Sequence, residues 1–214
     1  MRTCGCSLQH ERRRVVLTGG PGAGKTAVLE LIRQHFCEHV LVLPEAASIV
    51  FGGGFPRKPS HGAREAAQRA IYFVQRELEA VADANGNTAI IVCDRGTLDG
   101  LAYWPSDEDA FWASVGSSRA RELARYDEVL HLRVPEPSTY NHANPLRLET
   151  PREAAELDHR IEHAWRGHPH RHFIPSDPVF LKKAFAAIEH LRLVVPECCR
   201  KGQGTLAILN GTAG

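Results

Sequence analysis

Apolar residues alternate along the chain between short continuous runs and longer stretches with a repeat of three to four. The short runs predict buried strands at 14–18, 40–43, 88–93, 128–134 and 171–174. The longer stretches predict helices at 25–36, 61–84, 106–124 and 176–193. Because strands and helices alternate, the pattern predicts an α/β fold whose parallel sheet is covered by helices on both faces.

Polar residues mark the predicted helix starts. Ser106 and Ser176 are the expected N-caps of their helices, and Pro178 suits the first turn of the last helix. Thr150-Pro-Arg-Glu153 reads as a capping box, which predicts a further helix from about 151. This helix falls in the long segment 136–170 between the last two strands, which we interpret as a helical lid.

The segment between the first predicted strand and the first predicted helix is rich in glycine. It reads Gly19-Gly20-Pro21-Gly22-Ala23-Gly24-Lys25-Thr26, a complete G-x-x-x-x-G-K-[ST] phosphate-binding loop. Its backbone N–H groups and the helix N-terminus attract phosphate, Lys25 can reach the terminal phosphates, and the Thr26 hydroxyl can bind Mg²⁺. A dinucleotide-binding G-x-G-x-x-G turn does not end in Gly-Lys-Thr. The loop therefore predicts binding of ATP with Mg²⁺.

Charged residues follow the second and third predicted strands, at the sheet edge where ligands of such folds bind. Asp94 ends an apolar strand and can hold Mg²⁺ opposite Thr26, although a solvated aspartate that caps the next helix gives the same pattern. Glu45 can take a proton from, or bind, an acceptor hydroxyl, and an N-cap or surface ion pair is the alternative. Arg95 can meet a phosphate or a carboxylate. We expect Lys25, Glu45, Asp94 and Arg95 to be the catalytic residues.

The segment 136–170 is basic. It holds Arg147, Arg152, Arg160 and Arg166. A basic lid can close over a triphosphate and neutralise the charge that develops during transfer. We take Arg147 and Arg160 as nucleotide-binding residues, with an i,i+4 pair to Glu156 as the alternative for Arg160.

Histidines and cysteines raise the question of zinc. His159-Arg-Ile-Glu-His163 matches H-x-x-E-H, but such a match arises easily among 12 histidines, and its helix already belongs to the lid. The six cysteines include Cys4 and Cys6 near one end and Cys198 and Cys199 near the other. We expect reduced thiols, with a metal bound jointly by these two pairs as the alternative, although their spacing differs from that of a zinc ribbon.

Composition places the chain among ordinary globular proteins. It has 214 residues, 43% of them hydrophobic and 24% charged, and a net charge of +1. This balance gives no indication of nucleic-acid binding, and no apolar run is long enough for a membrane span. We expect a cytoplasmic protein with tails at 1–12 and 196–214 around one domain at 13–195. The oligomeric state stays open, with a homodimer as one alternative.

Three further stretches complete a family pattern. They are Pro44-Glu45-Ala46-Ala47, Asp94-Arg-Gly-Thr-Leu-Asp99-Gly-Leu-Ala-Tyr103 and, in the lid, Arg147-Leu-Glu149. With the phosphate-binding loop, they resemble the P-loop kinase-like AAA-domain family that includes the ribosylnicotinamide kinase domain of the bacterial NAD regulator.

The resemblance implies a three-layer P-loop NTPase fold, sheet order 2-3-1-4-5, and Glu45 and Arg95 facing the acceptor. The related deoxynucleoside kinases carry a serine where this chain has Gly96, which weakens the case for a deoxynucleoside acceptor.

Two functions compete at this stage. The first is an ATP-dependent kinase that phosphorylates a small, nucleoside- or nucleotide-like acceptor not identified by the sequence, with Arg64 and Gln68 shaping its pocket. The second is an NTPase or switch that uses the same site to signal to a protein or lipid partner.

Overall fold

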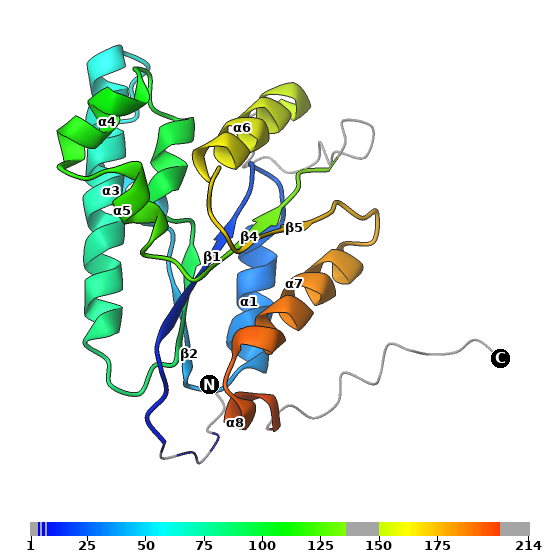
Figure 1. Ribbon diagram of the computed structural model, residues 1–214. Coiled ribbons are helices and arrows are strands. Elements are labelled where there is room, and N and C mark those ends of the chain that lie inside the picture. Colours follow the sequence, from blue (N-terminus) through cyan, green and yellow to red (C-terminus); the bar gives the residue numbers. More distant parts are fainter. Residues whose placement is uncertain (1–3, 5, 7, 136–149, 202–214) are drawn as a thin grey trace.

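A five-stranded parallel sheet forms the centre of the molecule (Figure 1). The computed structural model describes residues 4, 6, 8–135 and 150–201. The strands are β1 (Arg13–Thr18), β2 (Val40–Leu43), β3 (Ile90–Asp94), β4 (Glu128–Leu132) and β5 (Arg171–Ile174). Their order, β2-β3-β1-β4-β5, is the predicted one, and the three-layer α/β P-loop fold is confirmed.

Helices cover both faces of the sheet. One face carries α1 (Lys25–His35), α7 (Phe180–Val194) and α8 (Glu197–Lys201). The other carries α3 (His61–Asp83), the 3₁₀ helix η1 (Thr97–Ala102), α4 (Glu108–Val115), α5 (Arg119–Leu123) and α6 (Pro151–Ala164). The short α2 (Ala46–Gly52) follows β2 and packs against α3. None of the helices within residues 8–135 and 150–201 is long and apolar enough to cross a bilayer.

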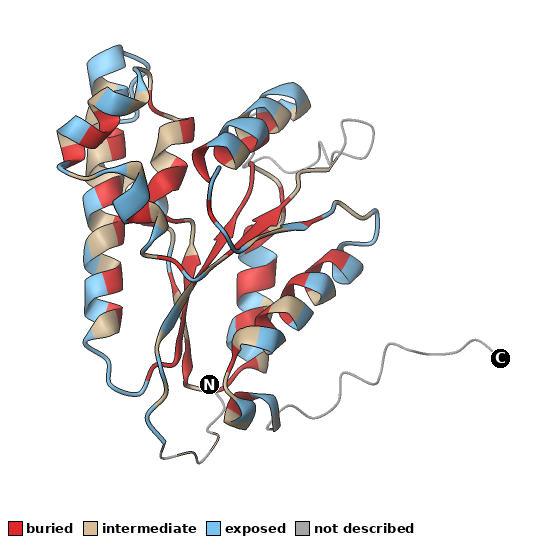
Figure 2. Cartoon of the chain, in the orientation of Figure 1, coloured by how far each residue is buried: buried red, intermediate tan, exposed pale blue. Residues whose placement is uncertain are grey.

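The core lies in two layers, one on each face of the sheet (Figure 2). The strands are apolar on both sides, as parallel strands between two helical layers must be. In β1, Val15 and Leu17 face α1 and α7, whereas Val16 faces α3 and η1. Asp94 ends β3 and Glu45 follows β2, so both carboxylates lie at the carboxyl edge of the sheet.

Three predicted helix boundaries are wrong. The helix expected at 106–124 is interrupted because Gly116 takes a left-handed conformation, φ 66°, and ends α4. Asp107, rather than Ser106, caps α4 by accepting a hydrogen bond from the Ala110 N–H. The last helix starts at Phe180 instead of near 176.

One predicted helix start is confirmed, and two helices were not predicted. The predicted capping box is confirmed, since Thr150 and Glu153 hydrogen-bond each other's backbone at the start of α6. The helices α2 and α8 had no counterpart in the sequence pattern; α8 lies within the segment expected as the C-terminal tail.

Candidate active site

The glycine-rich loop joins β1 to α1 at the carboxyl edge of the sheet. Gly19, Gly22 and Gly24 all have positive φ, at 133°, 79° and 91°. A side chain at Gly19 would collide with the carbonyl oxygen of Leu132, and one at Gly24 would come 2.6 Å from the Phe180 ring. Both the backbone conformation and the close packing therefore require glycine, and the loop encloses a small concave surface of backbone.

Lys25 is buried at the base of this loop. Its Nζ donates to the carbonyl oxygens of Gly19 at 2.8 Å and Gly20 at 3.0 Å. Burial lowers the pKa of Lys25 to about 7, and the charge of Arg95 adds to this effect against the opposing attraction of Asp94. A bound phosphate would place a negative charge next to this ammonium group, which contacts only neutral carbonyl oxygens through its hydrogen bonds. Thr26 follows in the first turn of α1 and is exposed, free to meet a ligand.

Asp94 ends β3 directly opposite Leu17 of β1. Its Oδ1 is buried and has no hydrogen-bond partner among the residues the structure describes. Burial raises the pKa of Asp94 to about 6, although the charge of Lys25 opposes the rise. A buried, unpaired carboxylate oxygen next to a phosphate-binding loop has the chemistry of a Mg²⁺ ligand.

Glu45 and Arg95 form an ion pair between β2 and β3. Arg95 Nε donates to Glu45 Oε1 at 2.8 Å, and Ser48 donates to Glu45 Oε2 at 2.5 Å. Burial works to raise the pKa of Glu45, but Arg95 and Ser48 hold it below its ordinary value. Arg95 has a left-handed backbone, φ 69°, which is uncommon outside glycine and occurs at functional sites.

Asp99 connects this ion pair to β1 and to the end of α6, and the sequence analysis gave it no role. It accepts hydrogen bonds from Arg95 at 3.2 Å, the Thr18 hydroxyl, the Gly96 N–H at 3.0 Å and Trp165 Nε1 at 3.1 Å. The bonds from Thr18, Gly96 and Trp165 hold the Asp99 carboxylate in place, and this carboxylate in turn orients Arg95. The only sequence feature that could have identified Asp99 was its place in the Asp-Arg-Gly-Thr-Leu-Asp stretch. Asp94 and Glu45 were noticed because they follow strands, whereas Asp99 lies inside a 3₁₀ helix.

The helix α6, which lies in the segment predicted as a lid, is attached to the P-loop through Asp158. Asp158 Oδ1 accepts from the Gly20 N–H at 2.7 Å and lies 2.9 Å from His131 Nε2. Its Oδ2 accepts from Arg133 at 3.3 Å, and Arg133 also pairs with Glu162 at 2.6 Å. Neither Asp158 nor Arg133 was predicted, because nothing in the local sequence shows which side of a lid helix faces the loop.

Lys183 of α7 supports the loop from the other side. Its Nζ donates to the carbonyl oxygen of Ala23 at 2.7 Å and to that of Arg133. It is almost fully buried, and burial lowers its pKa to about 8. The loop is thus held by β1, α6 and α7, a rigid support for a binding surface made of backbone.

A cavity of about 460 Å³ opens beside the P-loop. Its lining includes Pro21 of the loop and the Glu45–Arg95 pair, and α3 contributes Arg64 and Gln68 as expected from the sequence. Aromatic, amide and basic side chains complete it, from Phe51, Arg57, Lys58, Tyr72, Gln75 and Tyr103. Of the predicted groups, Glu45 and Arg95 line this cavity, and Lys25 and Asp94 are close enough to both to interact with their charges. Thr26 lies in the first turn of α1, next to the loop.

The two predicted lid arginines lie elsewhere or are not described. Arg147 falls outside the described residues. Arg160 is exposed and lines a second cavity of about 390 Å³ with His159 and His163. It is two residues from Asp158, hence on the opposite side of α6 from the contact with the P-loop.

The H-x-x-E-H residues do not form a three-ligand site. His163 Nε2 hydrogen-bonds Arg166, and Glu162 pairs with Arg133. Within the described part of the chain, the groups of three or more potential metal ligands include neither His159 nor His163.

Comparison with known proteins agrees with this geometry. A family model described as an AAA domain matches residues 14–179, from β1 to the turn before α7. The chain belongs to the AAA-domain family. Among curated proteins, no sequence matches it. As an AAA-domain protein with an intact phosphate-binding loop, it is a nucleotide-binding P-loop protein.

Proposed function

We propose that this AAA-domain protein is a small-molecule kinase that transfers the γ-phosphoryl group of ATP to a hydroxyl or phosphate of a nucleoside- or nucleotide-like acceptor. The cavity beside the P-loop carries the proposal. At about 460 Å³ it falls within the range of small-molecule sites, roughly 300–1,000 Å³. It is separate from the loop that would hold the triphosphate yet shares Pro21 with it. A protein that only hydrolyses ATP needs no second site there.

The donor half fits ATP and Mg²⁺. Thr26 and Asp94 would hold Mg²⁺, since one is an exposed hydroxyl at the loop and the other a buried carboxylate with an unpaired oxygen. When bound, Mg²⁺ neutralises charge on the phosphate oxygens. Lys25 would exchange its hydrogen bonds with Gly19 and Gly20 for phosphate oxygens.

The acceptor half suits a planar, polar molecule. Phe51, Tyr72 and Tyr103 contribute aromatic surface to the lining, and Gln68 contributes an amide of the kind that reads a heterocycle. Arg57 stacks over Phe51, with its Cζ 4.2 Å from the ring centroid, and presents a positive charge to the same cavity. These features support a nucleoside-like acceptor, with or without a phosphate.

Glu45 acts in this scheme by positioning rather than by proton abstraction. Arg95 and Ser48 already donate to its two oxygens and hold its pKa low, which makes the carboxylate a weak base. Phosphoryl transfer through a loose transition state needs little base catalysis but strict alignment. Glu45 therefore accepts a hydrogen bond from the acceptor hydroxyl, while Arg95 places a positive charge between acceptor and donor.

The test is a screen of ADP release with nucleosides, nucleotides, ribosylnicotinamide and sugars as acceptors. A kinase should release ADP at least tenfold faster with its acceptor, and the phosphorylated product should appear in equal amount. Gln68→Ala should raise the KM of that acceptor and leave the KM of ATP unchanged. If ATP binds and no acceptor accelerates ADP release, the kinase proposal fails and the switch function takes its place.

A further inference from the structure

Five cysteines and two histidines gather at the amino ends of the strands, the sheet edge opposite to the P-loop. They come from three distant parts of the chain: Cys4, Cys6 and His10 before β1, Cys37 and His39 between α1 and β2, and Cys198 and Cys199 in α8. None of them takes part in the active site. The sequence analysis expected reduced thiols, with a joint metal site of the two terminal pairs as the alternative. The fold, rather than a local motif, brings these side chains together.

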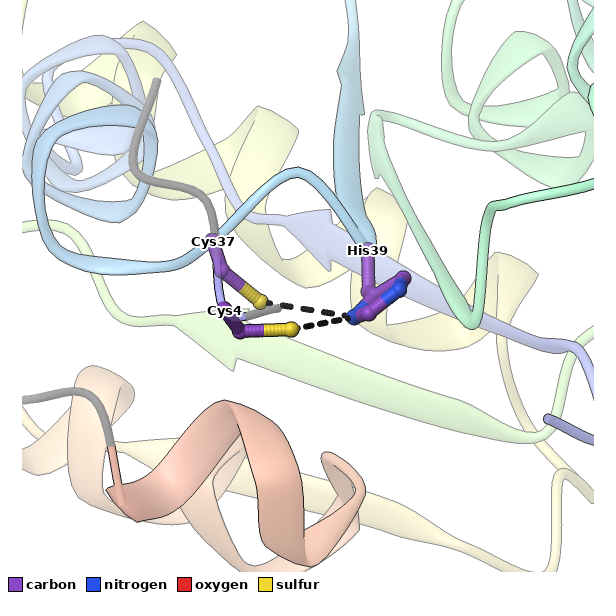
Figure 3. Close-up of side chains that lie close together, drawn as sticks. All are labelled: Cys4, Cys37 and His39. Atoms are coloured by element: carbon purple, nitrogen blue, oxygen red, sulfur yellow. Dashed lines mark hydrogen bonds between the residues drawn. The ribbon is translucent and has the colours of Figure 1, made fainter. Parts of the chain in front are cut away.

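His39 lies at the centre of the group. Its Nδ1 is 3.1 Å from the Cys4 sulfur and 3.7 Å from each of the Cys37 and Cys199 sulfurs. The Cys37 and Cys199 sulfurs are 3.2 Å apart. Figure 3 shows the sulfurs of Cys4 and Cys37 pointing at the same ring nitrogen of His39. Three sulfur atoms from three segments therefore converge on one imidazole nitrogen.

The other ring nitrogen of His39 is already assigned. Nε2 lies 3.2 Å from Asn87 Oδ1, an oxygen that can only accept, so Nε2 carries the proton and Nδ1 presents a lone pair. One lone pair cannot satisfy three thiols. His39 is fully buried, Cys37 and Cys199 are nearly so, and Cys4 is partly buried. A ligating histidine whose second N–H donates to an oxygen is the usual arrangement around a protein-bound metal.

The spacing of these atoms matches a zinc site. With Zn–S bonds of about 2.3 Å and Zn–N bonds of about 2.0 Å, the ligand atoms of a tetrahedral site lie roughly 3.5–3.8 Å apart. Of the separations within this group, the two of 3.7 Å fall in this range, and those of 3.1 Å and 3.2 Å fall slightly below it. The Cys4 and Cys37 sulfurs lie within 4.8 Å of each other. A disulfide between Cys37 and Cys199 would need a bond of about 2.05 Å instead. Thiolate and imidazole ligands in a tetrahedron favour zinc over magnesium or calcium.

We propose that this protein binds one structural Zn²⁺ ion through Cys4, Cys37, Cys199 and Nδ1 of His39. Binding replaces the three thiol protons, which pass to solvent, and forms three Zn–S bonds and one Zn–N bond. The ion cross-links the segment before β1, the α1–β2 connection and α8. It closes the site with four protein ligands, as structural rather than catalytic zinc sites are closed.

Two neighbouring groups are the natural comparisons. Cys6, His10 and Cys198 form an adjoining set, with His10 Nε2 at 3.6 Å and 3.2 Å from the two sulfurs. Glu128, His172 and His190 form a third set on β4, β5 and α7. The first has three ligand atoms, and the second is partly exposed, with His172 41% accessible. Neither has the four converging ligands of the proposed site.

Metal analysis of the full-length, untagged protein tests the proposal. Protein dialysed after growth with zinc should retain about one zinc per chain. Cys37→Ser and His39→Asn should each lower the zinc content at least tenfold. Cys93→Ser, which removes a buried thiol inside β3, and His190→Ala, which removes a histidine of the third set, should retain it. Equal loss of zinc in either control would overturn the assignment.

A titration of the wild-type protein with Co²⁺ tests the site without relying on variants that could fail to fold. Wild-type protein stripped of metal and titrated with Co²⁺ should develop the thiolate charge-transfer and tetrahedral absorption bands at one equivalent, and Zn²⁺ should remove them. Stripping should also lower the Tm of the wild type by several degrees and leave that of Cys37→Ser unchanged. Protein that shows no such bands, or that contains a Cys37–Cys199 disulfide, would refute the zinc site.

Discussion

Asp94 carries a cost to stability that its replacement should remove. Its pKa rises from an ordinary 3.8 to about 6 because burial disfavours the charged carboxylate. One pKa unit corresponds to about 1.4 kcal/mol, so the difference amounts to roughly 3 kcal/mol in the nucleotide-free protein. Asp94→Asn keeps the shape of the side chain and removes the charge. We therefore expect the variant to be more stable than the wild type by up to about 3 kcal/mol at pH 8.

The gain should depend on pH in a defined direction. Below about pH 4 the carboxyl is protonated in both the folded and the unfolded chain, so charge costs nothing and the two proteins should be equally stable to within about 1 kcal/mol. As pH rises from 4 to 7, the unfolded chain loses its proton first, and the wild type is progressively destabilised. The advantage of Asp94→Asn therefore appears in this window and is complete by about pH 8.

Urea unfolding at pH 4, 6 and 8 measures this effect, with Asp109→Asn on the exposed surface of α4 as the matched control. The control should change stability by less than about 0.5 kcal/mol at every pH. Asp94→Asn should also lose the rise in Tm that Mg²⁺ and ATP give the wild type. A variant that is less stable at pH 8, or whose gain does not grow with pH, would refute the assignment of Asp94 as a buried, unpaired charge.

Three further predictions concern the surroundings of the site. Gly96→Ser should lower the free energy of unfolding by about 1–3 kcal/mol in urea, because the new Cβ would lie 2.8 Å from the Trp165 ring; equal stability would contradict this packing. Asp158→Ala should raise the KM of ATP about tenfold with a smaller change in kcat, since the Gly20 N–H and Arg133 lose their partner; an unchanged KM in steady-state kinetics would mean that the lid contact does not shape the loop. Arg160→Ala should leave the KM of ATP within twofold, because this side chain lines the second cavity, and a tenfold rise would restore its predicted role on phosphate.

The sequence predicted those parts of the molecule that follow from local patterns. Apolar runs located the strands, and the fixed spacing of the P-loop placed Lys25 and Thr26 at the start of α1, directly after the loop that follows β1. Asp94 and Glu45 were recognised because each ends a strand, and all parallel strands end at the same edge of the sheet. The structure also explains why position 96 is glycine, where related deoxynucleoside kinases have serine: the Trp165 ring occupies the space that a side chain would need.

Contacts between distant segments could not be predicted in this way. Asp158 contacts the loop and Arg160 does not, because residues two positions apart on a helix point to nearly opposite sides. Which of the two faces the loop depends on the rotation of α6 about its axis. The convergence of Cys4, Cys37 and Cys199 depends on where both ends of the chain run. Their spacing along the sequence carries no trace of it, so a comparison with zinc-ribbon spacing does not bear on this group.

The two edges of the sheet have opposite energetic characters. The carboxyl edge concentrates features that oppose folding: an unpaired Asp94 oxygen, a lysine whose pKa is lowered by burial, and a left-handed Arg95. Backbone strain of the kind seen at Arg95 amounts to about 1–3 kcal/mol and persists only where the surrounding structure enforces it. Nucleotide and metal can relieve the unpaired charges, so the edge is most stable when occupied. The amino edge has no such ligand from the reaction. A zinc ion there would stabilise the fold whether or not nucleotide is bound, and would leave the other edge free to keep the groups that phosphate requires.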